Sequence, residues 1–323
     1  GLLLMISARG LSHFWPHQIY EFKVEQATGS AVYTAEIHNT RVRVFEDPQN
    51  PGTSLRENQI LLKTANRDVF GIDFRWVNEG NITAKEVANG ITVFERYSQG
   101  DLFGNIQALE VNGDRFDDLQ VVKQRMQAQL NESRDIRQEV RKIERGLIGG
   151  INYQLEQIRF EQRRLEQRGQ LTSEDIASFD AERARLNQEF ADLETVRAEL
   201  YSRLRALGTV VVTLSDGSER RLGLDQVVDF WQPNDMHLGQ KIVFFLGSIK
   251  NFLLDDPREA NTEGGVFPAI VGTFTMVILM TLFVMPMGIL AAIYMREYAK
   301  EGPVLKFCLL YTSPSPRDRT RSR

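Results

Sequence analysis

The chain of 323 residues is long enough for one to three domains, and its 42% hydrophobic and 25% charged residues average to the composition of a soluble protein. The net charge of −4 and the lack of a basic tract exclude nucleic acid as the main partner, and the single cysteine, Cys308, excludes an internal disulfide. The average conceals an uneven distribution, because apolar residues concentrate at the two ends of the chain and charged residues in its middle.

Residues 1–18 are predicted to hold the end of a first transmembrane helix that the chain enters part-way. The segment GLLLMISARGLSHFWP starts apolar and ends with Phe14 and Trp15, aromatic residues typical of a membrane interface. Arg9 lies close enough to that end for its guanidinium to reach the headgroups. The end of a signal peptide is the alternative, but no small-residue cleavage pattern follows.

Residues 19–113 are predicted to form the first part of a β-rich domain, and residues 208–233 its second part. Short runs in the first part alternate in hydropathy or carry β-branched and aromatic residues. These runs are AVYTAEI, RVRVF, QILLKTA, VFGIDFRWV and ITVFERY. Turn-forming clusters such as DPQNPG separate them. In the second part, VVVTL and ERRLGL flank residues 215–218, which have the composition of a hairpin turn.

The insertion between these two parts, residues 114–207, is predicted to be an antiparallel coiled-coil hairpin. It contains no proline, and its apolar residues recur at intervals of three and four on otherwise charged helices. Residues 168–173 supply the turn between the arms. Thr172 and Asp175 have the spacing of a capping pair for the second helix.

Two further expectations concern this hairpin. Gly149 and Gly150 interrupt the first helix and are expected to bend it. Each arm would extend about 50 Å at 1.5 Å per residue, with its charges facing solvent. A sharper hypothesis is that the tip, residues 167–175, docks another protein.

Residues 234–262 are predicted to be a connector that contains an amphipathic helix, residues 234–254. Its sequence, MHLGQKIVFFLGSIKNFLL, mixes apolar and basic positions. Two interpretations stay open, namely a helix that lies on the outer membrane surface and a helix packed under the β-rich domain.

Residues 263–307 are predicted to contain a transmembrane helix, residues 265–294, because the uncharged run is longer than the 20 or so residues that cross a bilayer. A buried helix of a soluble protein is the alternative. The preceding flank is acidic with one arginine, Arg258, whereas Arg296 and two lysines follow. Since Lys and Arg accumulate on the cytoplasmic side, Gly265 is expected outside and Arg296 inside.

The last stretch, residues 308–323, breaks abruptly from the preceding pattern. Its start, CLLYTSPSPRD, resembles the translation of an adapter used in DNA library preparation, so these residues are set aside from reasoning about the fold. A native tail rich in Ser, Pro and Arg is the alternative.

Motifs for chemistry are absent from the sequence. It has no GxxxxGK[ST] loop, no strand-linked GxGxxG, no HExxH and no CxxC. His13 and His17 have helical spacing, but Pro16 lies between them. The acidic pairs 117–118 and 255–256 are expected to cap helices or face water. We therefore predict no catalytic, metal or cofactor-binding residue, and no enzyme activity within this chain.

The stretch from residue 263 to 303 resembles the start of the permease core of the PstA family, the permease subunits of phosphate ABC transporters. The segment GLSHFWP near the start of the chain also resembles the end of the first helix in this family. The motif residues on which the resemblance rests, with structural or gating roles expected, are Gly264, Gly265, Pro268, Gly272, Thr273, Pro286, Gly288, Arg296 and Glu297.

The resemblance implies a long-form permease subunit of a phosphate importer in the bacterial inner membrane, truncated at its C-terminal side. Two transmembrane helices, the first one truncated, would flank a periplasmic β-rich domain that carries the coiled-coil hairpin, with residues 19–261 outside. The implied partners are a second permease subunit, cytoplasmic ATPase subunits and a periplasmic phosphate-binding protein. This chain would bind no cofactor, and the family's coupling loop would lie beyond Lys306.

Two other classes of protein stay open. Periplasmic adaptors of efflux or secretion systems also join β domains to a coiled-coil hairpin, usually with one anchoring helix. A membrane sensor with two helices and an outer ligand-binding domain would continue into a signalling linker after Arg296. A permease would instead continue into further spanning helices.

Overall fold

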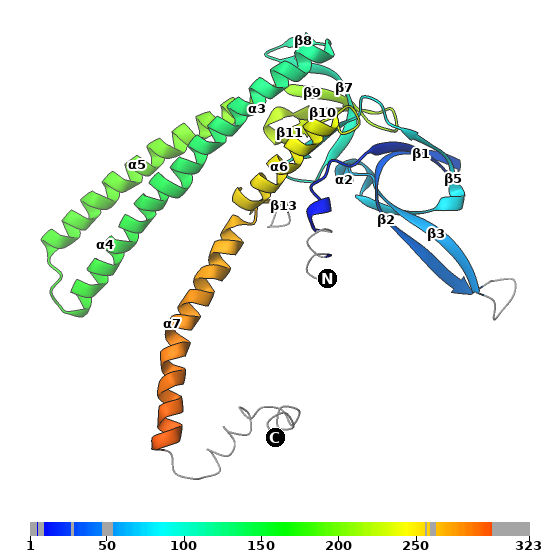
Figure 1. Ribbon diagram of the computed structural model, residues 1–323. Helices are drawn as coiled ribbons and strands as arrows, with labels where there is room; N and C mark the ends of the chain where they lie inside the picture. The colour runs from blue at the N-terminus through cyan, green and yellow to red at the C-terminus, as the bar shows by residue number, and fades with distance from the viewer. Residues whose placement is uncertain are drawn as a thin grey trace. The chain divides into compact units, whose positions relative to one another are not determined.

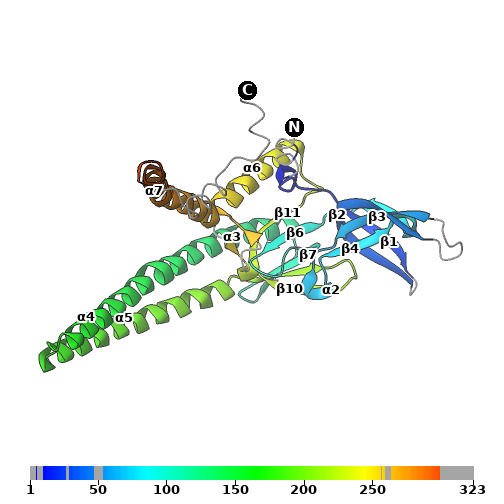
Figure 2. The same ribbon diagram turned by 90° about the horizontal axis from the view of Figure 1, so that it is seen from below.

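The computed structural model describes residue 5 and residues 10–26, 29–46, 54–255, 257–258 and 263–298, and only the backbone of residues 263, 295 and 296. It divides into two compact units, Gly1–Ile249 and Lys250–Arg323. The predicted end of a first helix therefore falls mostly outside the described residues, and the stretch 308–323 falls wholly outside them. The architecture is mixed, as the sequence predicts, with two antiparallel sheets, a long helical hairpin and a long apolar helix (Figures 1 and 2).

The first sheet is antiparallel and has the strand order β4-β3-β2-β1-β5. Its strands are β1 (Ile19–Gln26), β2 (Gly29–Glu46), β3 (Ser54–Lys63), β4 (Phe74–Asn78) and β5 (Ile82–Val87). β4 and β5 lie at opposite ends of this order, yet only the 3-10 helix η1 (Glu79–Asn81) separates them in sequence. A three-residue link is too short to join distant edges, so the sheet curls on itself, as the ring of strands in Figure 1 shows.

The second sheet has the order β10-β9-β7-β6-β11. Its strands are β6 (Thr92–Arg96), β7 (Leu102–Val111), β9 (Thr209–Thr213), β10 (Glu219–Gly223) and β11 (Val227–Trp231), and the short β8 (Asp114–Phe116) pairs with β7. A three-residue 3-10 helix, η3 (Leu224–Gln226), joins β10 to β11. The turn predicted at residues 215–218 lies between β9 and β10, which pair as a hairpin.

The two sheets repeat one topology. When the short β8 is left out, the first strand of each sheet in sequence lies between the second and the fifth, and a 3-10 helix joins the fourth strand to the fifth. Ile19 and Phe22 are buried in the first repeat at the same spacing as Ile91 and Phe94 in the second. The sequence analysis missed this repeat, because few other positions share a residue type and the second copy is divided by the helical hairpin.

The hydropathy of the run VFGIDFRWV predicts a single strand, and this prediction is wrong. Its first two residues complete the short helix α2 (Arg67–Phe70), and β4 begins only at Phe74. The reason is the buried Asn66 before the helix, whose side chain accepts from the Phe103 amide at 2.8 Å and donates to the Phe103 carbonyl at 3.0 Å. These two bonds hold the segment on the second sheet and interrupt its pairing in the first. Conversely, the runs AVYTAEI and RVRVF form one continuous strand, β2.

The predicted helical hairpin is confirmed, with shifted boundaries. Its first arm consists of α3 (Leu119–Arg141), a π-helical segment η2 (Lys142–Ile148) and α4 (Gly149–Gln167), and its second arm is α5 (Ser173–Arg205). Residues 114–116 belong to β8 rather than to the hairpin. The predicted interruption at Gly149 and Gly150 is wrong in position, because both residues are helical and the irregular segment is η2, just before them.

Side chains cap both arms of the hairpin as their sequence predicts. The Thr172 hydroxyl accepts from the Asp175 amide at 3.1 Å, and the Asp175 carboxylate accepts from the Thr172 amide at 3.0 Å. At the start of α3 the Asp118 carboxylate accepts from the Gln120 amide at 2.8 Å. Each bond satisfies an N–H group that the first turn of a helix leaves without a backbone partner.

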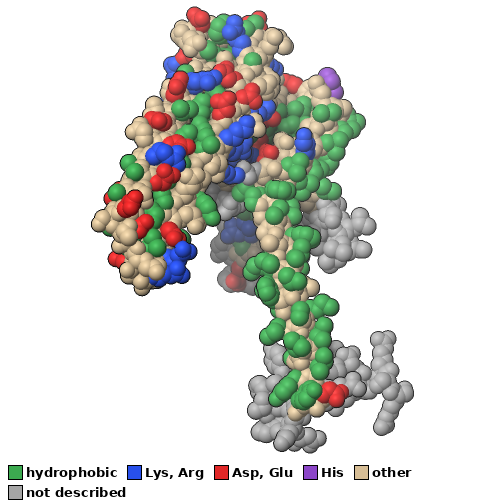
Figure 3. All heavy atoms as spheres, turned by 90° about the vertical axis from the view of Figure 1, so that its left-hand side faces the viewer, with side chains coloured by type: hydrophobic (Ala, Val, Ile, Leu, Met, Phe, Trp, Pro, Cys, Tyr) green, Lys and Arg blue, Asp and Glu red, His purple; other side chains and the backbone are tan. Residues whose placement is uncertain are grey.

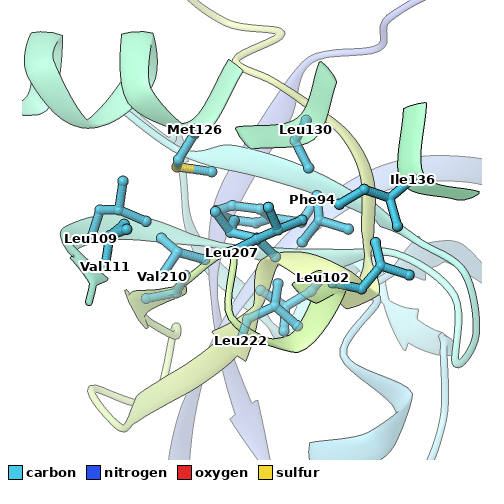
Figure 4. Packing of buried hydrophobic residues seen from close by; sticks show 14 of the residues in the cluster. Phe94, Leu102, Leu109, Val111, Met126, Leu130, Ile136, Leu207, Val210 and Leu222 are labelled. Carbon is cyan, nitrogen blue, oxygen red and sulfur yellow. The ribbon is translucent and has the colours of Figure 1, made fainter. Parts of the chain in front are cut away.

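The main core lies where the base of the hairpin crosses the second sheet (Figure 4). Met126 and Leu130 of α3 are fully buried against Phe94 of β6, and Leu204 follows from α5. A smaller cluster, which includes Ile91, joins the two sheets. The base of the hairpin is thus part of the folded domain rather than an appendage.

The remaining elements are the helix α6 (Leu238–Leu254), a short ladder of β12 (Pro257–Arg258) and β13 (Glu263–Gly264), and the helix α7 (Phe267–Glu297). α6 begins four residues later than the sequence predicts, because residues 233–235 form a turn and residues 236 and 237 are not yet helical. The boundary between the two compact units falls near the end of α6, after Ile249, rather than at the start of the connector.

Candidate functional site at the start of the apolar helix

The helix α7 is long and apolar enough to cross a membrane. Residues 267–294 carry no Asp, Glu, Lys or Arg, and 28 residues of helix measure about 42 Å, more than the thickness of a hydrocarbon core. Within the described residues no other helix meets this criterion. Figure 3 shows apolar side chains along α7, with acidic ones only near its end. The predicted span is confirmed at this coarse level.

Two threonines of α7 donate their hydroxyl hydrogen bonds to backbone carbonyl groups of the same helix. The Thr273 hydroxyl donates to the Ala269 carbonyl at 2.5 Å, and the Thr281 hydroxyl donates to the Val277 carbonyl at 2.8 Å. A threonine has one O–H donor. In this rotamer neither side chain can donate a hydrogen bond to an oxyanion.

A tight corner joins the end of α6 to the start of α7. The Val266 amide donates to the Phe252 carbonyl at 2.8 Å, so the residue before α7 is bound to the last turn of α6. Gly264 has φ +89°, in the left-handed region that side chains disfavour. A Cβ atom on the buried Gly265 would lie only 1.8 Å from the Asp255 carbonyl oxygen. Both positions of this corner therefore require glycine, and each for its own reason.

The other motif residues are distributed along α7 and do not converge. Pro268 occupies the first turn, where a proline costs no hydrogen bond, and Pro286 lies inside the helix. Gly272 and Gly288 have open space around them, so nothing in the described chain requires glycine there. The pair 296–297 ends the helix, and the Arg296 side chain lies outside the description. The sequence motif is thus a corner followed by a helix, not a pocket.

The first part of α6 belongs to the first unit and packs within it through aromatic side chains. The rings of Phe244 and Trp231 have centroids 4.8 Å apart, and those of Phe245 and Trp15 are 5.8 Å apart. Trp231 ends β11, and Trp15 belongs to the N-terminal segment. Phe244 thus contacts the β-rich domain, and both interpretations of the connector stay predictions.

The distal part of the hairpin holds itself together without a core. Between residues 152 and 185, all of which the structure describes, no side chain is buried. Ion pairs one turn apart, such as Arg159 with Glu156 at 2.8 Å, lie on its surface. Tyr153, Phe160 and Ile176 are exposed among these charges. The predicted docking tip is therefore accessible, but its occupant stays a hypothesis.

Two ion pairs of buried or partly buried side chains stabilise the contact between the two sheets. The Arg96 guanidinium is 3% exposed, and it donates to the Asp68 carboxylate at 3.0 Å and to two carbonyl groups of the loop after β6. Burial alone would raise the pKa of Asp68, but the hydrogen bond and the charge of Arg96 outweigh it and hold that pKa below its ordinary value. Lys63 and Asp101 form a second pair at 2.7 Å. These pairs have a structural role.

Residues for catalysis or metal binding do not come together in the described part of the chain. No group of three His, Cys, Asp or Glu side chains there could hold a metal ion. The His17 ring bonds to the Ser12 carbonyl at 3.1 Å, and the His13 ring packs on Phe14. A shallow hollow of about 370 Å³ includes Trp15 and Lys241 in its lining, but no nucleophile paired with a base.

Comparison of the chain with protein-family models, with curated proteins and with solved structures gave no match in any of the three searches.

Sequence reasoning missed the partners of the corner and of the connector. The Asn234 side chain forms hydrogen bonds with the backbone of Ile19, 215 positions away. The backbone carbonyl of Asp255 lies against Gly265 and leaves no room for a side chain there. The adjacent glycines at 264 and 265 were the available signal for the corner. For Asn234 the sequence offers only a proline before it, a sign of a turn.

Proposed function

We propose that the chain is part of a permease subunit of an ATP-driven importer of inorganic phosphate. The observation that carries the proposal is that two lines of reasoning agree on the same glycines. The resemblance to phosphate permeases selects Gly264 and Gly265, and the backbone geometry independently restricts both positions to glycine. The corner they make is followed at once by the apolar helix.

The proposed subunit is a multi-pass protein of the bacterial inner membrane. Gly265 lies on the periplasmic side and Arg296 on the cytoplasmic side, following the charge of the flanking segments. The two sheets and the helical hairpin are then periplasmic. The second permease subunit completes the channel, separate ATPase subunits hydrolyse ATP, and a periplasmic binding protein delivers phosphate. A chain with no phosphate-binding loop fits this division of labour.

In this proposal α7 is a scaffold and a wall of the gate rather than the phosphate site. An oxyanion in a membrane needs positive groups or hydrogen-bond donors along a wet path. α7 has no charge between residues 267 and 294, and the O–H groups of Thr273 and Thr281 are already bonded to carbonyls. The anion ligands therefore belong to other segments of the transporter.

Phosphate uptake tests the proposal. The full-length protein is expressed with the partner subunits in a bacterial host that lacks its own phosphate permease, and uptake of radiolabelled phosphate is measured. Restored uptake is expected. No uptake despite normal membrane expression would refute the proposal. The double variant Thr273→Val and Thr281→Val is expected to keep most of the uptake, and complete loss would refute the scaffold role of α7.

A periplasmic adaptor of an efflux or secretion system is the second candidate. The observation in its favour is the helical hairpin, whose base packs on the second sheet and whose distal part exposes Phe160 and Ile176 on either side of the tip. This candidate predicts no phosphate uptake and a partner at the tip. A photo-crosslinking residue at Phe160 would identify that partner in cells, and crosslinks to a channel or secretion component would favour the adaptor.

A further inference from the structure

The helix α6 is apolar on two sides, and only one of them is covered. Phe244 and Phe245 pack on the tryptophans of the first unit. Apolar side chains outside this contact are open, with Leu238 67%, Val243 72% and Leu246 60% exposed. Together with the exposed Ile242, these form what we call the α6 stripe: Leu238, Ile242, Val243 and Leu246. The i, i+4, i+8 spacing of its leucine and isoleucine residues places them on one face of the helix.

The charges of α6 suit a phospholipid surface. Leu238–Leu254 contains no acidic residue and has two lysines, Lys241 and Lys250. Lysine stems lie along apolar surface while the ammonium group reaches polar surroundings, and cationic groups attract anionic lipid headgroups. Lys250 is exposed one turn after Leu246, whereas Lys241 lines the hollow beside Trp15. A helix with exposed leucine and valine beside a lysine is typical of an element that lies in the membrane interface.

A hydrogen bond holds the last turn of α6 next to the first residues of α7. The Phe252 carbonyl is bonded to the Val266 amide, one residue before the apolar helix begins. Where α7 crosses a bilayer, Phe252 is therefore held at the outer end of the span. Leu253 and Leu254, both exposed, extend the apolar surface of α6 to this point. The membrane is thus the apolar partner within reach of α6.

We propose that the α6 stripe binds the outer surface of the phospholipid bilayer, at the boundary between headgroups and acyl chains. The face of α6 opposite Ile242 and Leu246 contacts the β-rich domain through Phe244. The helix would thus attach that domain to the membrane. This inference rests on the membrane-spanning part of the proposed function, but not on phosphate as the substrate.

Site-directed fluorescence in liposomes tests the inference. The full-length protein, with every native cysteine replaced by serine, receives one cysteine at Leu246 or at Val243, and each cysteine carries an environment-sensitive NBD label. The liposomes contain phosphatidylethanolamine and phosphatidylglycerol, with or without a lipid that bears a nitroxide near the top of its acyl chain. Blue-shifted emission, loss of most fluorescence with the nitroxide lipid and little quenching by aqueous iodide are expected at both positions.

Two control labels fix the scale. A label at the exposed Asn187 of α5 reports water, and is expected to be quenched by iodide alone. A label at Val277 of α7 reports the span, and is expected to be quenched by nitroxide lipids.

Iodide quenching at Leu246 and Val243 would overturn the inference, because the stripe would face water. Protection from both quenchers would also overturn it, because a protein would cover the stripe. Either result combined with lipid quenching at Val277 would leave the span standing. Failure of phosphate uptake with lipid quenching at Leu246 would sink the proposed substrate alone.

Discussion

Replacing Gly265 by alanine is expected to open the corner between α6 and α7. The added Cβ would lie 1.8 Å from the Asp255 oxygen, 2.4 Å from its carbonyl carbon and 2.8 Å from its Cα. Real Cβ contacts are essentially never shorter than 3.0 Å, so the two backbone segments must separate by at least 1.2 Å. No flexible side chain can move to make this space, because all three of these atoms belong to the backbone.

The magnitude follows from what the separation breaks. Overpacking against backbone costs about 1–3 kcal/mol, and the hydrogen bond between the Val266 amide and the Phe252 carbonyl contributes about 1 kcal/mol more. The corner should therefore lose about 2–4 kcal/mol of local stability. Because one factor of ten corresponds to about 1.4 kcal/mol, amide protection there should fall at least about tenfold. The two sheets lie in the other compact unit and should be unaffected.

Hydrogen exchange followed by mass spectrometry, on protein reconstituted in nanodiscs, measures this effect. The informative peptide spans residues 252–267. Gly272→Ala is the matched control, since its Cβ would meet no atom within 4 Å, and it should exchange like the wild type. Unchanged protection of the peptide in Gly265→Ala would refute the reasoning that steric contact makes this glycine obligatory.

Two further predictions concern the stability of the first unit, measured by urea titration of the full chain in detergent with tryptophan fluorescence. Asp68→Asn should cost at most about 1 kcal/mol at neutral pH, because it removes the charge that faces the buried Arg96 guanidinium, while solvent at the partly exposed Asp68 screens this pair. Since the folded-state pKa of Asp68 is lowered, the difference between variant and wild type should persist above about pH 4 and disappear as the pH falls through that lowered value. Glu182→Gln on the hairpin surface should change nothing measurable, and an equal effect of the two variants would contradict this account. Phe22→Ala and Phe94→Ala should each cost about 3–5 kcal/mol, because both fully buried rings fill the same position of the internal repeat. A loss below about 1 kcal/mol for either would show that its site is not a packed core.

Local sequence signals predicted the elements whose stability is local. The charged helices of the hairpin, the pair Thr172 and Asp175 at its turn and the turn at 215–218 depend on neighbours a few residues apart, and the structure has all three. The exception within the hairpin is Gly149, where the sequence placed a bend. A glycine destabilises a helix by only about 1 kcal/mol relative to alanine, so the helix continues through Gly149. The irregular segment is η2, which lies just before this glycine.

Long-range contacts decided the rest of the fold. Asn66 interrupts a run that alternates like a strand, because its side chain is engaged by Phe103, 37 positions away. The internal repeat was hidden for a similar reason, since its second copy closes only when β9 returns to β7 after the hairpin. No pattern within a window of 10 to 20 residues contains either partner.

By itself, the sequence determined the apolar helix and the hairpin, because length, periodicity and the absence of charge are properties of consecutive residues. The tertiary structure alone decided why Gly265 must be glycine, since the Asp255 carbonyl that excludes a side chain comes directly after another helix, α6. It also decided which face of α6 is covered: Phe244 meets Trp231, and the α6 stripe does not. Apolar residues along α6 look alike in sequence, and only the position of a partner separates those that pack from those that stay exposed.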